Sequence, residues 1–290
     1  MPDSPYFRMA LLAATVTLGF APNAAAEPRR AHELEHVEPW FLAAEFGGSA
    51  LFSTLIFVAA GPPASHCSWC GSDAFDESVR RALLADNPRA PAAFSHALSS
   101  AAAPVLALGA LVPTALSEGQ TRHAVENVVI AGDAVMITLG LTHASKRVFD
   151  RERPGVHHGV MGRTEYADSP AQWNQSFFSA DTSVAFALAS SATTVSYLRG
   201  YSIAPYVLAL GSAIGVGTAC GRIAADVHWA TDVITGAVLG TAVGFALPFT
   251  LHRRRSSAAA ADGTDTTERA VTVVPLLGRG EVGVFASGRF

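Results

Sequence analysis

The chain has 290 residues, of which 50% are hydrophobic and only 15% are charged, and its mean hydropathy is +0.29. This composition is too apolar for an ordinary soluble domain, and the length favours a single domain. The formal net charge of −4 argues against a nucleic-acid partner, because such proteins need a strongly basic surface to displace counterions from phosphates.

The first segment of the chain predicts export. Arg8 precedes an apolar run over 9–21, and small residues follow up to Ala26. This pattern predicts a signal peptide over 1–26 that is cut after Ala26. Because Asp3 weakens the positive start of the segment, an uncleaved N-terminal anchor is the alternative. In both cases the chain enters or crosses a membrane.

Residues 32–36 have the sequence HELEH, which matches the H-E-x-x-H pattern of zinc peptidases. His32 and His36 would lie one helical turn apart, a spacing that suits one metal ion. The stretch directly follows the expected cleavage site, however, where no folded cleft would enclose a catalytic zinc. We therefore interpret it as a polar helix face that leads into the first apolar run, and we expect no metal site.

Six apolar runs follow, each about twenty residues long and so long enough to cross a bilayer at ~1.5 Å per residue. They are rich in Ala and Gly, and small residues let helices approach closely inside a membrane bundle. The sequence predicts an all-α fold, a six-helix transmembrane bundle, with a buried soluble helical core as the alternative. The runs cover approximately 40–60, 94–116, 126–145, 180–198, 202–220 and 230–251.

Three cysteines are present, two of them in a CSWC stretch at 67–70. A single C-x-x-C without a second pair is a poor metal site, whereas a local disulfide between Cys67 and Cys70 is compatible with an exported loop. Cys220 ends the fifth apolar run, and we interpret it as a packed thiol.

The ends of the later runs keep polar residues in three places. The first is KRVFDRERP, where Lys146 and Arg153 are seven residues apart. Seven residues are two helical turns, so both side chains can point the same way, and Pro154 ends the turn. A basic anchor at the membrane edge is the alternative interpretation.

The second place is SFFSADTSVAF at 176–186, where Ser179 and Asp181 stand at the start of an Ala-rich run. Such residues cap the free backbone N–H groups of a helix start. The same N–H groups also bind anions. The local sequence leaves both interpretations open.

The third place is GRIAADVHWATD, where Arg222 precedes His228 by six residues and Asp232 follows His228 by four. Residues four apart are neighbours on one helix face. A carboxylate there can accept a hydrogen bond from one imidazole nitrogen, so that the other nitrogen faces a substrate as a base or nucleophile. A purely structural His–Asp pair is the alternative.

The last segment predicts an appendage to the bundle. After Arg255 a polar linker leads to a weakly alternating stretch that contains Gly278 and Gly280, which is typical of a short β-hairpin. We expect a membrane domain over 27–255 and a linker with a tail over 256–290.

In this order and spacing, the three polar places resemble the signature motifs of the type 2 phosphatidic acid phosphatase and vanadium haloperoxidase superfamily, in its membrane lipid-phosphatase branch. The resemblance covers roughly residues 40–250. It implies that three cations grip the phosphate oxygens, that His228 attacks phosphorus to form a phosphohistidine, and that Asp232 orients His228. It also implies that no metal or cofactor is needed. The three cations are Lys146, Arg153 and Arg222.

The second motif departs from the family pattern. The family has Pro-Ser-Gly-His where this chain has Phe178, Ser179, Ala180 and Asp181, so only the Ser is kept. Ser179 and the N–H groups from Ala180 onward can still bind phosphate. The family's His protonates the leaving group, and we assign that role here to Asp181.

Two other features concern the proton donor and the third motif. His157 and His158 in an adjacent loop are the alternative proton donors to Asp181, although they also fit an ordinary polar loop. The third motif has Gly221 where the family usually has Ser, which we expect to be a mild change.

The resemblance implies a phosphatase for a lipid-borne phosphate monoester or diphosphate, because six apolar runs favour a lipid substrate. A phosphate- or lipid-binding pseudoenzyme is the alternative, since Asp181 replaces the usual His, and a vanadate-dependent haloperoxidase is a minor one. The sequence identifies neither the lipid nor the oligomeric state.

We expect the active site to face the periplasm from a bacterial inner membrane. A cleaved signal peptide would place the mature N-terminus outside, whereas Arg29, Arg30 and the HRRR stretch at 252–255 place the non-catalytic side in the cytoplasm by the positive-inside rule. These two indications conflict for the N-terminus. The oxidising compartment needed by the CSWC stretch favours the periplasmic orientation.

Overall fold

The structure, a computed structural model, describes residues 37–59, 66–260, 271–278 and 281–288, with side chains over 37–59 and 66–251. The expected signal peptide over 1–26 and the HELEH stretch at 32–36 lie outside the described residues. The chain divides into two compact units, one up to Leu251 and one from His252 onward.

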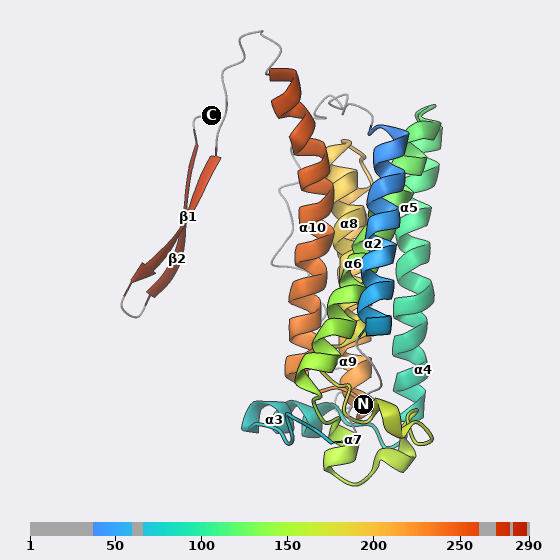
Figure 1. Ribbon diagram of the computed structural model, residues 1–290, viewed down its shortest axis with the longest axis vertical. Helices are drawn as coiled ribbons and strands as arrows, with labels where there is room; N and C mark the ends of the chain where they lie inside the picture. Colours follow the sequence, from blue (N-terminus) through green and yellow to red (C-terminus); the bar gives the residue numbers. More distant parts are fainter. Residues whose placement is uncertain (1–36, 60–65, 261–270, 279–280, 289–290) are drawn as a thin grey trace. The chain divides into compact units, whose positions relative to one another are not determined.

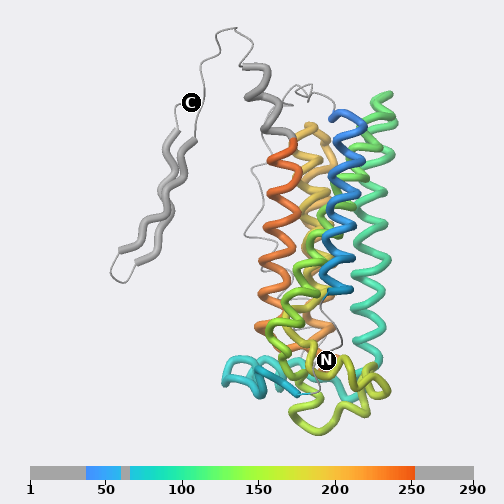
Figure 2. Tube along the Cα trace, viewed as in Figure 1, coloured from blue at the N-terminus to red at the C-terminus, as the bar shows by residue number. Residues whose placement is uncertain are grey.

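Six long helical rods form a bundle, as the apolar runs predict (Figure 1). The second rod is composite, because α4 passes into α5 through one π-helical turn at Leu98–Ala102. Figure 2 follows the same rods as a trace, from α2 in blue to α10 in orange. The rods are α2 (Pro39–Ala59), α4 (Arg89–Ala97) with α5 (Ala103–Ser117), α6 (Thr121–Phe149), α8 (Ala180–Leu198), α9 (Ala204–Ala224) and α10 (Ala230–Ala260).

Five of the six rods are long and apolar enough to cross a membrane, and α8 is the exception within the described residues. Five Ser and Thr residues lie in the second half of α8, and most of them are buried against neighbouring helices. Length and composition thus support five of the six expected spans. α8 packs on α5, α6 and α9, so neighbouring helices enclose its polar side chains.

The short elements gather at one end of the bundle, where α6 and α9 end and where α4, α8 and α10 begin (Figure 1). They include α3 (Ala74–Leu83) and α7 (Pro154–His157), with single 3-10 turns at Met161–Arg163 and Pro170–Gln172. A disulfide joins Cys67 to Cys70 at this end, as expected, and Cys220 is a buried free thiol. The segment beside the disulfide is bound to the loop after α6, since Ser68 N donates to Asp150 O over 3.2 Å.

Buried polar contacts join the start of α6 to the end of α8. Arg199, the C-cap of α8, donates to Glu126 Oε2 over 2.8 Å and to Asn127 Oδ1 over 2.6 Å. Both acceptors lie in the first two turns of α6 and are buried. A buried charge needs a partner of opposite sign, so this ion pair fixes the two helices at the end away from α7.

Helix α10 approaches α8 through a line of glycines at positions i, i+4 and i+8. A Cβ atom added to Gly236, Gly240 or Gly244 would lie 2.9, 2.1 or 2.3 Å from a carbonyl oxygen of α8. Only glycine permits this separation of the two backbones. The line of glycines therefore sets the distance between α10 and the first half of α8, the part of α8 that begins at Ser179.

Later in the chain, strands β1 (Val271–Gly278) and β2 (Glu281–Gly288) pair antiparallel, with Gly278 opposite Glu281. This is the hairpin that the alternating C-terminal sequence predicts. Helix α10 continues to Ala260, so the first five residues of the expected linker are helical.

We expect Gly240→Ala to destabilise the protein by about 1–3 kcal/mol or more, because the new methyl group would force α10 away from Ser183 O. The readout is the thermal unfolding midpoint of the purified protein in detergent. Gly109→Ala is the matched control, since nothing lies within 4 Å of a Cβ at that helical position. Equal midpoints for both variants would contradict the close packing of α8 and α10.

Candidate active site

The sequence-predicted site residues come from separate helix ends and meet at the end of the bundle where α3 and α7 lie (Figure 1). Each is in the last or first turn of a helix or in the adjoining loop. Six of the eight are buried, with exposed fractions of 8% or less, whereas Ala180 and Asp181 at the start of α8 are partly exposed. The six buried residues are Lys146 of α6, Arg153 before α7, Ser179 before α8, Arg222 of α9, His228 between α9 and α10, and Asp232 of α10.

The imidazole of His228 lies between a cation and a carboxylate. Its Nε2 is 3.3 Å from Arg153 Nη1, and its Nδ1 is 3.5 Å from Asp232 Oδ2. A guanidinium can only donate, so Nε2 is the acceptor and the ring proton belongs on Nδ1, facing Asp232. The Nδ1 contact lies within ion-pair range but is not a hydrogen bond in this arrangement.

Burial holds His228 in its neutral form. Its pKa is well below the ordinary imidazole value, first because desolvation penalises the charged ring and then because Arg153, Arg222 and Lys146 repel a further positive charge. A neutral ring with an unprotonated Nε2 is the form that can attack an electrophile.

The carboxylate of Asp232 is saturated by hydrogen bonds. Ser176 Oγ donates to its Oδ2 over 2.5 Å, Trp229 N donates to the same oxygen over 2.9 Å, and Arg151 donates to Oδ1. In addition, Ser179 N donates to the Asp232 carbonyl oxygen over 3.2 Å. One residue thus joins the segments before α7, before α8 and before α10.

Arg153 is held rigidly and has no carboxylate partner among the described side chains. It donates to the carbonyl oxygens of Gln172, Val227 and Gln175 over 2.7 to 3.0 Å. Its guanidinium also lies 4.2 Å from the centre of the Tyr166 ring. Carbonyl contacts fix the plane of the guanidinium without neutralising its charge, so the charge remains available to an anion.

The other two cations differ in their pairing. Lys146 makes no ion pair with any described carboxylate, whereas Arg222 is paired on both sides. Arg222 Nη2 lies 2.7 Å from Glu165 Oε1, and its Nε lies 3.4 Å from Asp181 Oδ2. Lys146 and Arg222, like Arg153, act electrostatically on His228 and disfavour a positive charge on its ring.

Ser179 is the N-cap of α8, and its hydroxyl accepts a hydrogen bond from Thr182 N over 3.4 Å. The capping interpretation of SFFSADTSVAF is therefore confirmed. Capping does not use up the helix start, because the N–H groups of Ala180 and Asp181 have no hydrogen-bond partner among the described residues. Free N–H groups at a helix start favour a bound anion.

Asp181 accepts rather than donates hydrogen bonds in this arrangement. Ser99 Oγ donates to its Oδ1 over 2.6 Å, and His96 Nδ1 lies 3.1 Å from the same oxygen. The Arg222 contact occupies Oδ2. All three contacts favour the ionised carboxylate, which cannot donate a proton.

The contact with His96 is new relative to the sequence prediction. His96 lies on α4, and its side chain is 66% exposed, so it connects Asp181 to the surface at the site end. The sequence carried one usable signal, because His96 is an ionisable residue within the second apolar run, where such residues are rare and functional. Its pairing with Asp181, 85 residues away, depends on the fold.

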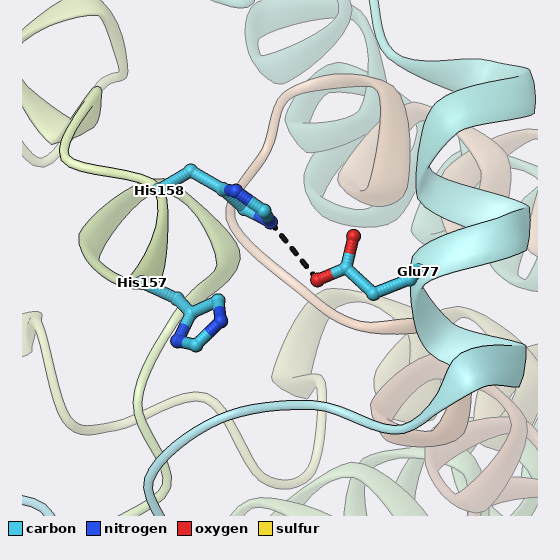
Figure 3. A group of neighbouring side chains, drawn as sticks. All are labelled: Glu77, His157 and His158. Atoms are coloured by element: carbon cyan, nitrogen blue, oxygen red, sulfur yellow. Dashed lines mark hydrogen bonds and ion pairs between the residues drawn. The ribbon is translucent and has the colours of Figure 1, made fainter.

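His157 and His158 do not join the cations around His228. His157 Nδ1 lies 3.2 Å from Glu152 Oε2, and His158 Nε2 lies 2.9 Å from Glu77 Oε1 (Figure 3). Both rings also contact the ring of Trp229, at centroid distances of 5.9 and 6.2 Å. No contact joins either ring to a sequence-predicted site residue within the described part of the chain.

Sequence reasoning also missed Arg151 and Asp76, which are 1% and 0% exposed. Arg151 bridges two carboxylates, since Nη2 lies 2.6 Å from Asp76 Oδ2 and Nη1 contacts Asp232. Its guanidinium also lies 3.9 Å from the centre of the Trp69 ring. The spacing from Lys146 and the following Pro154 pick out Arg153, but the role of Arg151 cannot be inferred from the sequence, because its partners are remote.

Gly221 lies where α9 passes very close to α4. A Cβ atom there would be 2.7 Å from Ser95 Cβ and 3.2 Å from Pro91 O. A serine, the usual family residue at this position, would not fit without a shift of α4. The absence of a side chain at 221 thus has a steric cause.

Residues 127–256 match the family model of the PAP2 superfamily. This segment is somewhat under half of the chain, and the match supports the resemblance to the type 2 phosphatidic acid phosphatase and haloperoxidase superfamily. No curated protein matches the chain. The matched segment contains all of the sequence-predicted site residues, from Lys146 to Asp232. Because members of the superfamily are mostly phosphatases, the match supports a phosphoric ester hydrolase at the level of the family only.

We expect Arg151→Met to destabilise the protein by about 3–5 kcal/mol, because it leaves Asp76 and Asp232 buried without their cation. Unfolding in detergent measures this loss, and Arg89→Met on an exposed helix start is the control. Adding Asp76→Asn to Arg151→Met should recover part of the stability, since it removes one unpaired charge. A double variant less stable than Arg151→Met would contradict this account.

Proposed function

We propose that the protein is a metal-independent phosphatase that hydrolyses a lipid-borne phosphate monoester or diphosphate through a phosphohistidine intermediate. The observation that supports this most strongly is the state of His228. Its neutral ring presents an unprotonated Nε2 to Arg153, within a group of three buried cations. This is the electrostatic environment that a transferring phosphoryl group requires.

In the proposed first step, a phosphate group binds between His228 Nε2 and the cations. Lys146, Arg153 and Arg222 contact its oxygens, and the free N–H groups of Ala180 and Asp181 add to the field, as does the Ser179 hydroxyl. The Nε2 lone pair forms a bond to phosphorus while the bond from phosphorus to the lipid oxygen breaks. Asp232 stabilises the Nδ1 proton during the attack.

The leaving oxygen needs a proton, and we assign its source to His96 rather than to Asp181 itself. Asp181 holds His96 through Nδ1 at 3.1 Å, which leaves the other ring nitrogen to carry the proton. In the second step, this nitrogen accepts a proton from water as the water oxygen attacks phosphorus. The N–P bond then breaks, inorganic phosphate leaves and His228 is restored.

The membrane location supports a lipid substrate, because five described helices are apolar enough to cross a bilayer. The proposed site lies at one end of these helices, and His96 of α4 reaches the surface there with its side chain 66% exposed. A phosphate headgroup at the bilayer surface can meet the buried cations at this end while the acyl chains stay in the bilayer.

The disulfide supports a site that faces the periplasm of a bacterial inner membrane. Cys67 and Cys70 lie in the segment bound to the loop that precedes Arg151. Disulfides persist in oxidising compartments. The basic HRRR stretch follows directly on Leu251 in the last turns of α10, whose first turn carries Asp232, and basic residues favour the cytoplasm.

A phosphate-binding pseudoenzyme is the second candidate function. It is favoured by one observation, namely that Asp181, an acceptor in three contacts, stands where the family has a proton-donating His. Binding without turnover would follow if His96 did not supply the missing proton.

We expect His228→Ala to lower phosphate release from short-chain lipid phosphates by several orders of magnitude, because the nucleophile is lost. Acid-labile radiolabelled phosphate should be trapped on wild type and be absent from the variant. Since the pKa of His228 is well below its ordinary value, kcat/KM of wild type should not fall as pH is lowered to 6.5. Activity should persist in EDTA, and its immediate loss there would contradict a metal-independent reaction.

We expect His96→Gln to lower kcat for an alkyl phosphate by about 10²–10⁴-fold, the usual contribution of a general acid. The effect on a p-nitrophenyl phosphate should be small, because its leaving group departs without protonation. Asp181→Asn should show the same substrate dependence with a smaller loss, since the amide still contacts His96. The exposed His66→Gln is the control.

Three results would reject the role of His96. Equal losses with both substrates would indicate a structural defect. Unchanged rates would show that another residue is the general acid. A wild type that binds vanadate but turns over neither substrate would support the pseudoenzyme.

A further inference from the structure

Three potential metal ligands converge from two elements outside the proposed catalytic site. Glu77 lies on α3, whereas His157 ends α7 and His158 follows it. One ligand atom from each residue lies within 4.8 Å of the other two (Figure 3). In Figure 3 the two imidazoles approach the Glu77 carboxylate from the opposite side of the gap. Two imidazoles and one carboxylate are a donor set that zinc prefers.

The surrounding hydrogen bonds leave the required ligand atoms available. Glu152 Oε2 lies 3.2 Å from His157 Nδ1, which directs His157 Nε2 outward as the ligand atom. A carboxylate on the second nitrogen of a ligand histidine is the usual support of a zinc site. Ser72 Oγ likewise donates to Glu77 Oε1 over 2.7 Å and fixes the carboxylate, while Gly71 N donates to Glu152 Oε2 over 3.2 Å.

The site also has an apolar wall. The indole of Trp229 is 0% exposed and lies against both imidazole rings. Trp229 Nε1 donates to the Glu152 carbonyl oxygen over 2.8 Å, so the wall is joined to the supporting residue. An apolar wall limits the water that competes for a metal and holds the rings in place.

We propose that Glu77, His157 and His158 bind one Zn²⁺ ion, with water as the fourth ligand. Zinc ligands lie about 2.0–2.2 Å from the metal in a tetrahedral arrangement. His158 Nε2 and Glu77 Oε1 lie 2.9 Å apart and share a proton. The zinc ion would replace this proton, and both groups would move slightly outward to make room for it.

The ion would connect two elements that support the proposed catalytic site. Glu77 follows Asp76, which accepts hydrogen bonds from Arg151 and from Thr231 N. His157 is four residues after Arg153, and its N–H donates to the Arg153 carbonyl oxygen over 3.1 Å. Zinc would therefore stabilise the arrangement of the loops that hold Arg151 and Arg153, while His228 would react without it.

The test uses the full chain, purified in detergent, stripped with EDTA and titrated with ZnCl₂. We expect one zinc per chain by competition with a chromogenic chelator, and a higher thermal unfolding midpoint with zinc than without it. Glu152→Gln should weaken zinc binding by about 10–100-fold, as the loss of a supporting carboxylate usually does. The His157→Ala, His158→Ala double variant should abolish both the binding and the rise in midpoint.

A matched control addresses the other histidine pair of the chain. The His32→Ala, His36→Ala variant removes the HELEH pair and should bind zinc as wild type does. Glu77→Gln keeps the shape of the carboxylate and its contact with Ser72, so a folded Glu77→Gln protein that has lost zinc confirms the site even if the double histidine variant unfolds. Zinc binding that survives Glu77→Gln, or that is lost with His32 and His36, overturns the proposal.

Discussion

The carboxylate of Asp232 is fully buried and must therefore find its partners inside the protein, since an isolated charge costs several kcal/mol to remove from water. It finds Arg151, Ser176 and the N–H of Trp229. These partners come from three separate segments of the chain, and each segment also carries or adjoins a proposed site residue. Satisfying one charge thus sets the relative positions of Arg153, Ser179 and His228.

The buried cations divide into two kinds. Arg151 is neutralised between two carboxylates, so it is part of the scaffold. Arg153 and Lys146 are buried and form no ion pair with a described carboxylate, so no direct partner neutralises a positive charge on either. Uncompensated buried charge is costly to the folded state, and a bound phosphate would relieve that cost. The stability given up here is the source of the affinity proposed for phosphate.

The sequence was sufficient to predict the helical rods and the residues that converge at their ends. Long apolar runs have few alternatives to helices in a membrane, and charged residues at their ends are conspicuous against that background. The sequence also suggested that α8 is as apolar as the other helices. The length of an apolar run does not show whether neighbouring helices enclose its polar side chains. The roles of Arg151 and His96 were out of reach, since each is defined by a partner at least 75 residues away.

The close crossing of α4 and α9 links two departures from the family pattern. Gly221 lies against Ser95, and the next residue of α4, His96, contacts Asp181. The helix whose proximity excludes a serine at 221 is therefore the helix that brings an imidazole to the altered second motif. A serine introduced at 221 would push α4 outward together with His96, so a change in α9 would be felt at Asp181 through the helix between them.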